Sequence, residues 1–276
     1  MGRIEAVFDR LRVENRAALI PFFTAGDPDL QTTESLLLAL VDAGVDLIEL
    51  GVPFSDPMAD GPTIQAASER ALAAGATLAG ILTMVSRVRR QTEVPIILMG
   101  YYNPVFHFGP ERFVAEAAAA GVDGILLVDL PPEENGEMLG LMQAADLRLI
   151  TLLAPTTPPA RRQTLAAASQ GYLYYVSMTG VTGVQTVDAL AIREDVLALR
   201  RESVVPVAVG FGITSPKDAA AVAAFADAVV VGSALVKIIA AYGTSPELLP
   251  RVSAFIGSLG EAIRRAADTR SGPGNP

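Results

Sequence analysis

Short apolar runs alternate with helical patterns along this chain, and this alternation constrains the fold more than any other feature of the sequence. Several runs are continuous stretches of Val, Ile and Leu, which is typical of parallel strands covered on both faces. Each run is followed by a stretch whose apolar residues have helical spacing. The eight apolar runs cover residues 17–23, 46–50, 94–99, 123–128, 147–153, 172–176, 204–209 and 226–231.

Eight strand-and-helix units predict an α/β fold of the (β/α)8 TIM-barrel type. The chain has 276 residues, which is enough for one such barrel of roughly 250 residues. An extra helix is expected over residues 2–14, before the first strand, and a short helix over 233–241, after the eighth. Because no linker interrupts the units, we predict a single TIM-barrel domain over residues 1–268, followed by a disordered polar tail over 269–276.

The composition excludes several classes of function. The formal charge of −9 argues against binding to nucleic acid or to an anionic membrane. No apolar run approaches the roughly 18 residues that a membrane span needs. The chain has no cysteine and one histidine, His107, in an aromatic stretch expected to be a loop, so we expect no metal site. The lack of cysteine fits a reducing cytoplasm, where we expect the protein to act.

One acidic strand end and the loop behind it give the strongest sign of a site. Glu49 lies near the carboxyl end of the second predicted strand, and a loop rich in Pro and Gly follows with Asp56 and Asp60. A buried charge is costly unless it is paired, protonated or directed at a cavity, so Glu49 is a candidate acid. Other roles stay open: Glu49 as a structural carboxylate bound by backbone amides, Asp56 as a turn cap, and Asp60 as a helix cap.

Glycines at two neighbouring strand ends predict a phosphate site. In barrels of this type phosphate often lies between the loops after strands seven and eight, at the amino end of a short extra helix. Gly210 and Gly212 follow the seventh strand, while Gly232 and Ser233 follow the eighth. The long loop over 176–186 is expected to be a mobile lid that excludes water.

Seven segments of the chain, in order between residues 19 and 233, resemble the tryptophan synthase α chain family. The stretch over 49–61 is the most specific of them, whereas the glycine pairs alone are shared by many phosphate-binding barrels. The segments are LIPFFTAGDP (19–28), ELGVPFSDPMADG (49–61), YYNP (101–104), DLP (129–131), SMTGVTG (177–183), GFGI (210–213) and GS (232–233).

The resemblance implies a carbon–carbon lyase of tryptophan biosynthesis. Its retro-aldol reaction would cleave indole-3-glycerol phosphate to indole and glyceraldehyde 3-phosphate without a metal or cofactor. Glu49 would be the acid, and also the base for the glycerol hydroxyl, and Asp60 would stabilise positive charge at the indole nitrogen. The substrate-binding residues that the resemblance implies are Phe22, Tyr174, Thr182, Gly183, Phe211, Gly212, Gly232 and Ser233.

The resemblance also implies a partner, the tryptophan synthase β chain, which holds pyridoxal phosphate and takes up indole in an α2β2 heterotetramer. The contact residues that it implies are Asp56, Pro57, Asn103, Pro104, Phe106 and Pro131.

Three other functions compete with this one. A metal-dependent epimerase on the same fold needs several histidine ligands, and the chain has one. An indole-glycerol-phosphate synthase relies on lysines at strand ends, whereas Lys217 and Lys237 fall within predicted helices. The third is a barrel without catalysis that binds and activates a partner. Catalysis requires Glu49 and Asp60 to face one pocket.

Overall fold

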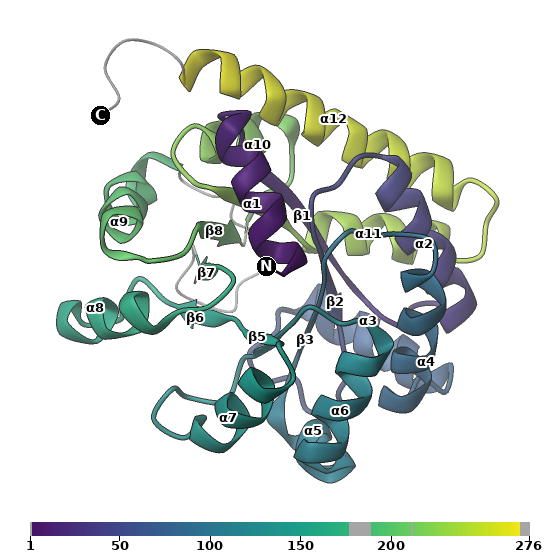
Figure 1. Cartoon of the computed structure of the whole chain (residues 1–276). Coiled ribbons are helices and arrows are strands. Elements are labelled where there is room, and N and C mark those ends of the chain that lie inside the picture. The colour runs from purple at the N-terminus through teal and green to yellow at the C-terminus, as the bar shows by residue number, and fades with distance from the viewer. Residues whose placement is uncertain (1, 177–188, 211, 271–276) are drawn as a thin grey trace.

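The computed structural model describes residues 2–176, 189–210 and 212–270. Its parallel strands are β1 Ala18–Thr24, β2 Ile48–Gly51, β3 Ile96–Gly100, β4 Gly124–Leu127, β5 Arg148–Leu149, β6 Thr151–Leu153, β7 Leu173–Val176, β8 Val207–Gly210 and β9 Ala228–Val231. They form one sheet in the order β5-β4-β3-β2-β1-β9-β8-β7-β6. Only Ile150 separates β5 from β6, so the two edges of the sheet meet at one chain segment. The sheet therefore curls into a barrel, and the expected TIM barrel is confirmed (Figure 1).

Helices surround the barrel on its outside, except for α1, which lies across one end of it (Figure 1). They are α1 Arg3–Val13, α2 Leu30–Asp42, α3 Pro62–Ala73, α4 Leu78–Arg89, α5 Tyr102–Phe108, α6 Pro110–Ala120, α7 Gly136–Ala144, α8 Pro159–Ala168, α9 Ala189–Glu202, α10 Pro216–Ala223, α11 Ser233–Tyr242 and α12 Leu248–Arg270. The predicted helix before the first strand and the short helix after the eighth are α1 and α11.

Two details differ from the sequence-based expectations. The aromatic stretch around His107 was expected to be a loop, which is wrong, because it belongs to helix α5. Pro104 lies in the first turn of that helix, where a missing amide hydrogen is tolerated. Helix α12 continues past the domain boundary expected at residue 268, and the division into domain and tail stays a prediction; residues 271–276 lie outside the described part.

Two hydrophobic cores result from the alternation of side chains along the strands. The larger core lies between the strands and the surrounding helices. The smaller core fills the inside of the barrel with inward-facing residues such as Ile20, Ile97 and Tyr172, and helix α1 adds Ile4 and Phe8 to it. Helix α1 is thus part of the barrel interior, not of the outer ring.

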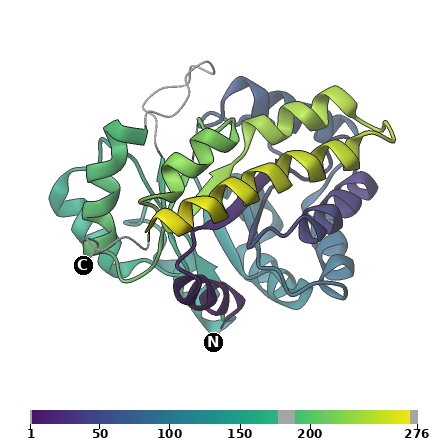
Figure 2. The same ribbon diagram turned by 90° about the horizontal axis from the view of Figure 1, so that it is seen from above.

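Helix α1 closes the amino-terminal end of the barrel (Figure 2). Ion pairs join this helix to the starts of strands β2, β4 and β5. The pairs are Arg10–Asp46 at 3.1 Å, Arg3–Asp123 at 3.2 Å and Arg148–Glu5 at 2.6 Å. Since all of these strands begin at this end, the opposite, carboxyl end is left for a site.

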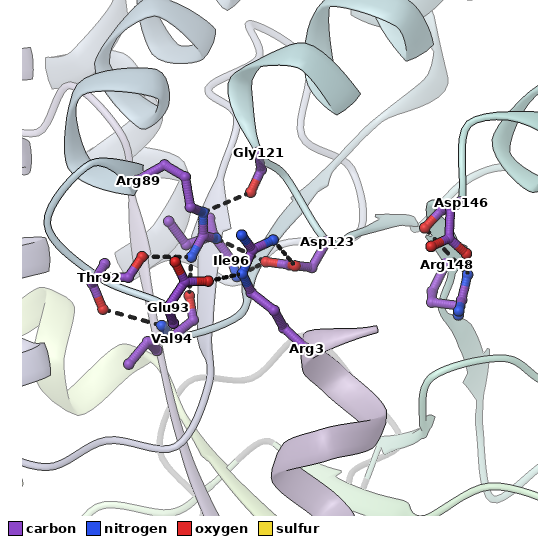
Figure 3. Close-up of polar contacts among 10 residues, drawn as sticks. All are labelled: Arg3, Arg89, Thr92, Glu93, Val94, Ile96, Gly121, Asp123, Asp146 and Arg148. Carbon is purple, nitrogen blue, oxygen red and sulfur yellow. Dashed lines mark hydrogen bonds and ion pairs between the residues drawn. The ribbon is translucent and has the colours of Figure 1, made fainter. Parts of the chain in front are cut away.

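Aspartates just before three strands share one structural role. Each accepts hydrogen bonds from an arginine and from a backbone amide at the start of the neighbouring strand. The sets are Asp46 with Arg16 and Leu19, Asp123 with Arg89 and Ile96, and Asp227 with Arg200 and Val207. Figure 3 shows the second set, where Arg3 and Arg89 both point at the carboxylate of Asp123. These carboxylates therefore fix the starts of the strands.

Across the described ranges, no one helix is both long and apolar enough to cross a membrane. Helices α3 and α4 meet the length and composition requirement only as a pair, with a bend of 94° between them.

Candidate active site

A pocket opens among the carboxyl ends of strands β1, β2, β3 and β4. Phe22 and Thr24 line it from β1, and Asp60 lines it from the loop after β2. The other lining residues are Gly51, Val52, Ile64, Ser68, Met99, Gly100, Tyr101 and Val128. The lining combines apolar side chains with the polar groups of Thr24, Asp60, Ser68 and Tyr101.

Glu49 lies inside the barrel, one inward-facing layer deeper than the lining residue Gly51. Strand register sets its neighbours, because Glu49 pairs with Phe22 on β1 and with Ile97 on β3. Its side chain is 0% exposed, and its Oε1 accepts a hydrogen bond of 2.5 Å from the hydroxyl of Tyr172. Burial raises the pKa of Glu49 to about 8, and the bond from Tyr172 opposes that shift. At neutral pH this carboxyl is therefore mostly protonated.

Asp60 has a wetter environment at the rim of the pocket. The hydroxyl of Tyr101 bonds to its carboxylate and also accepts a hydrogen bond of 3.0 Å from the amide of Ala59. Burial raises the pKa of Asp60 to about 6, with the hydrogen bond from Tyr101 acting in the opposite direction. Asp60 is therefore mostly ionised at neutral pH, whereas Glu49 is mostly neutral.

The structural roles that the sequence left open for these two acids are not the ones observed. No backbone amide of the described residues bonds to the Glu49 carboxyl, and its Oε2 has no hydrogen-bond partner among them. Helix α3 has Gly61 as its N-cap and no capping side chain, so Asp60 does not cap it. Neither acid forms an ion pair with a lysine or arginine within the described residues. Neither carboxyl is therefore held by the contacts that a structural role would require. Asp60 lines the pocket, whereas Glu49 is completely buried and is not among the residues that line it.

Tyr174 interacts electrostatically with both acids. Its side chain faces the barrel interior, and burial, together with negative charge on Glu49 and Asp60, raises the pKa of its phenol well above the usual range. A Cβ added at Gly210 would lie 1.9 Å from the Tyr174 hydroxyl. Glycine at this position is therefore what leaves room for the Tyr174 hydroxyl.

Part of the predicted phosphate site lies within the described residues. Gly232 caps the amino end of helix α11, and no side chain caps the first amides of that helix. A Cβ at Gly232 would lie 3.2 Å from the Phe22 ring, so this helix start adjoins the aromatic wall of the pocket. Gly212 has a φ of +78°, which favours glycine. Ser233 begins α11 and is exposed. An anion at this helix start would meet free amides beside the pocket.

Three predicted substrate-binding residues, Thr182, Gly183 and Phe211, lie outside the described residues, as does most of the expected lid over 176–186. Their roles stay predictions.

The predicted partner-contact residues lie on three neighbouring segments after strands β2, β3 and β4. Asp56, Asn103 and Phe106 are exposed, with Phe106 at 67%. Pro57, Pro104 and Pro131 are half-buried. Met58 is another exposed apolar side chain on the first of these segments, at 81%.

Sequence reasoning gave no role to Tyr172 or Tyr101, the two hydroxyls that bond to the acids. The signal for Tyr172 was its spacing of two from Tyr174, since residues two apart on a strand share a face. Tyr175, the residue after Tyr174, faces outward and bonds to Asp195 instead.

Among the residues that the structure describes, no three or more His, Cys, Asp and Glu side chains come together in a way that could hold a metal ion.

Known proteins resemble this chain over nearly its whole length. A family model for the tryptophan synthase alpha chain matches residues 8–264. The chain is 55% identical to the tryptophan synthase alpha chain of Geotalea uraniireducens over 264 residues, covering 96% of this chain and 98% of the relative. It is 54% identical to the Geobacter sulfurreducens protein of the same name, covering 95% and 99%. The crystal structure of the subunit from Legionella pneumophila superposes with a TM-score of 0.88 at 40% identity, covering 98% and 99%.

Fold and family match together define a TIM-barrel enzyme, with a pocket at the carboxyl ends of its strands. The chain belongs to the tryptophan synthase alpha chain family. It is a carbon–carbon lyase of tryptophan biosynthesis, which cleaves indole-3-glycerol phosphate to indole and glyceraldehyde 3-phosphate.

Proposed function

We propose that Glu49 and Asp60 carry out this cleavage as a pair of carboxyls in opposite protonation states. The observation that carries the proposal is the placement of the two acids in different environments. Glu49 is completely buried inside the barrel, where its pKa is raised to about 8, and Asp60 lines the pocket, where its pKa is raised to about 6. Two titratable groups whose environments push their pKa values apart are typical of an acid and an ionised partner.

The reaction follows from these two states. The neutral Glu49 gives its proton to C3 of the indole, which places a positive charge on the ring nitrogen. The ionised Asp60 stabilises that charge near the N–H group. The bond between C3 and the glycerol chain then breaks, and its electron pair restores the aromatic ring. Glu49, now a carboxylate, takes the proton of the glycerol hydroxyl as that carbon becomes the aldehyde of glyceraldehyde 3-phosphate.

The binding roles are part of the proposal. Phe22 packs against the indole ring, and Tyr174 orients it next to both acids. Gly212, Gly232 and Ser233 hold the phosphate with the free amides at the start of α11. Lid and phosphate contacts are assigned to Thr182, Gly183 and Phe211 on the strength of the family resemblance alone.

The proposal extends to the assembly. The family has a β-chain partner, and we propose an α2β2 heterotetramer in which pyridoxal phosphate belongs to the β chain alone, so that this chain needs no cofactor. The exposed Phe106 supports the contact surface formed by the segments after β2, β3 and β4. A cytoplasmic location is also proposed, because the family takes part in amino-acid biosynthesis.

The test is the substitution Glu49→Gln, which keeps the shape of the side chain but removes its proton chemistry. Indole release should fall by roughly 10²- to 10⁴-fold, the usual contribution of a general acid. The chain has no tryptophan, so indole fluorescence reports the product without protein background. Turnover that survives in a folded Glu49→Gln protein would reject the catalytic role and favour a barrel that only binds its partner.

A further inference from the structure

The carboxyl of Glu49 has two oxygens in different surroundings. Oε1 accepts the hydrogen bond of 2.5 Å from Tyr172, while Oε2 has no partner among the described residues. Both side chains are completely buried, so water does not compete for either oxygen. An oxygen that accepts a strong hydrogen bond is the carbonyl oxygen of a neutral carboxyl, so the acid proton is left on Oε2.

Tyr172 is itself held from the amino end of the barrel. Its ring lies 6.1 Å from the ring of Phe8, centroid to centroid, with an angle of 48° between them. Phe8 belongs to helix α1, which lies in front of the strands in Figure 1 and is tied to the strand starts by its ion pairs. The contact therefore links a rigid end of the barrel to the candidate acid at the other.

We propose that Tyr172 is a positioning residue for Glu49, which fixes its rotamer and assigns the transferable proton to Oε2, and that Phe8 holds Tyr172 in that position. The proposal rests on the proposed catalytic role of Glu49. No other phenol or charged group bonds to the Glu49 carboxyl from the described elements around it. The ionisable groups that interact electrostatically with Glu49 are Tyr172, just before β7, and Tyr174, within β7. Asp60 interacts with Tyr174 in turn.

Tyr172→Phe tests the first half of the proposal. Removing the hydrogen bond disfavours the carboxylate, so the limb of the kcat/KM profile that Glu49 controls should move upward by about one pH unit. The loss of a fixed rotamer should lower kcat by roughly 10- to 100-fold. Substrate binding should change little, because Tyr172 does not line the pocket.

Tyr175→Phe is the matched control. It makes the same substitution on the same strand, but Tyr175 faces the outer core and bonds to Asp195 at 3.3 Å. Its pH profile should be that of the unmodified protein. If Tyr172→Phe also kept the original profile and kcat, the positioning role would be rejected.

Phe8→Leu tests the second half. It should shift the same limb in the same direction by a smaller amount, since the hydroxyl remains but its ring is less constrained. Phe113→Leu is the control, because Phe113 is equally buried on α6 but belongs to the outer core. It should lose stability without any change in the pH profile. If the Phe8→Leu and Phe113→Leu proteins had the same pH profile, helix α1 would have no part in positioning Tyr172.

Two further results separate this inference from the proposed function. A folded Glu49→Gln protein that stays active would reject the catalytic role of Glu49, whereas an inactive one beside a normal Tyr172→Phe protein would reject the positioning role alone. If Tyr172→Phe does not fold, the infrared carbonyl band of isotope-labelled glutamate in the unmodified protein decides. The proposal expects a strongly hydrogen-bonded buried carbonyl, and a free carbonyl band would overturn it.

Discussion

Carboxyl groups at the two ends of the barrel have different hydrogen-bond partners. At the amino end, Asp46, Asp123 and Asp227 each bind an arginine and a strand amide. At the carboxyl end, Glu49 and Asp60 each bond to a tyrosine hydroxyl, with no ion pair to a described lysine or arginine. Burial raises the pKa of Asp123 as well, but its amide and arginine partners oppose the shift. The same chemical group therefore has a charged partner at one end, and at the other end it has a tyrosine partner and a raised pKa.

The largest expected effect is the cost of Glu49 to stability at high pH. Its pKa is about 8 in the folded protein, whereas that of an exposed glutamate is about 4.5. A carboxyl whose pKa is raised in the folded protein makes its full contribution to stability below its pKa in the unfolded protein. That contribution is lost as the pH rises through its pKa in the folded protein. The difference corresponds to at most about 5 kcal/mol at about 1.4 kcal/mol per pH unit.

Glu49→Gln should therefore be more stable than the unmodified protein at pH 9, while the two should have similar free energies of unfolding at pH 4. Urea unfolding at both pH values measures this. Equal stability at pH 9 would mean that Glu49 carries no desolvation penalty, and the contrast between the two ends would fail.

Asp60→Asn should lower turnover by roughly 10²- to 10³-fold, as for the loss of one preorganised electrostatic contact. In the unmodified protein, kcat/KM should fall as pH drops through about 6, where Asp60 is protonated, and as it rises through about 8, where Glu49 loses its proton. The variant should lose the acidic limb and keep the alkaline one. A variant with both limbs unchanged would assign the acidic limb to another group.

Asp123→Asn tests the amino end. The substitution leaves Arg89 largely buried without its charged partner, which should destabilise the fold by about 3 kcal/mol. The kcat of the folded protein should be unchanged, because Asp123 lies at the end away from the pocket. A loss of kcat at full folding would show that the two ends are not separate.

The smallest effect is expected for Arg3→Gln. Arg3 is 37% exposed and shares Asp123 with Arg89, so the carboxylate keeps one charged partner (Figure 3). The loss of stability should be under about 1 kcal/mol, as for other partly exposed ion pairs. Thermal unfolding at low and high salt measures it, and a loss as large as that of Asp123→Asn would contradict the ranking of the two arginines.

The sequence predicted the barrel because each strand and helix has its own local pattern. It also located Glu49, since a carboxylate within an apolar strand is unusual. The partners of Glu49 and Asp60 were not predictable in the same way, because Tyr172 lies 123 positions from Glu49 and meets it only when the barrel closes. Helix α5 was missed because Asn103 and Pro104 favour a turn by local propensity, whereas packing of Val105 against the core favours the helix.

Direct titration of Glu49 tests the central claim, that the carboxyl end of the barrel holds a neutral acid at neutral pH. The carboxyl carbon can be followed by ¹³C NMR or by isotope-edited infrared spectroscopy, with Glu49→Gln to assign the signal. We expect a titration near pH 8 in the free protein. A carboxyl that ionises near pH 4.5, like an exposed glutamate, would contradict the account.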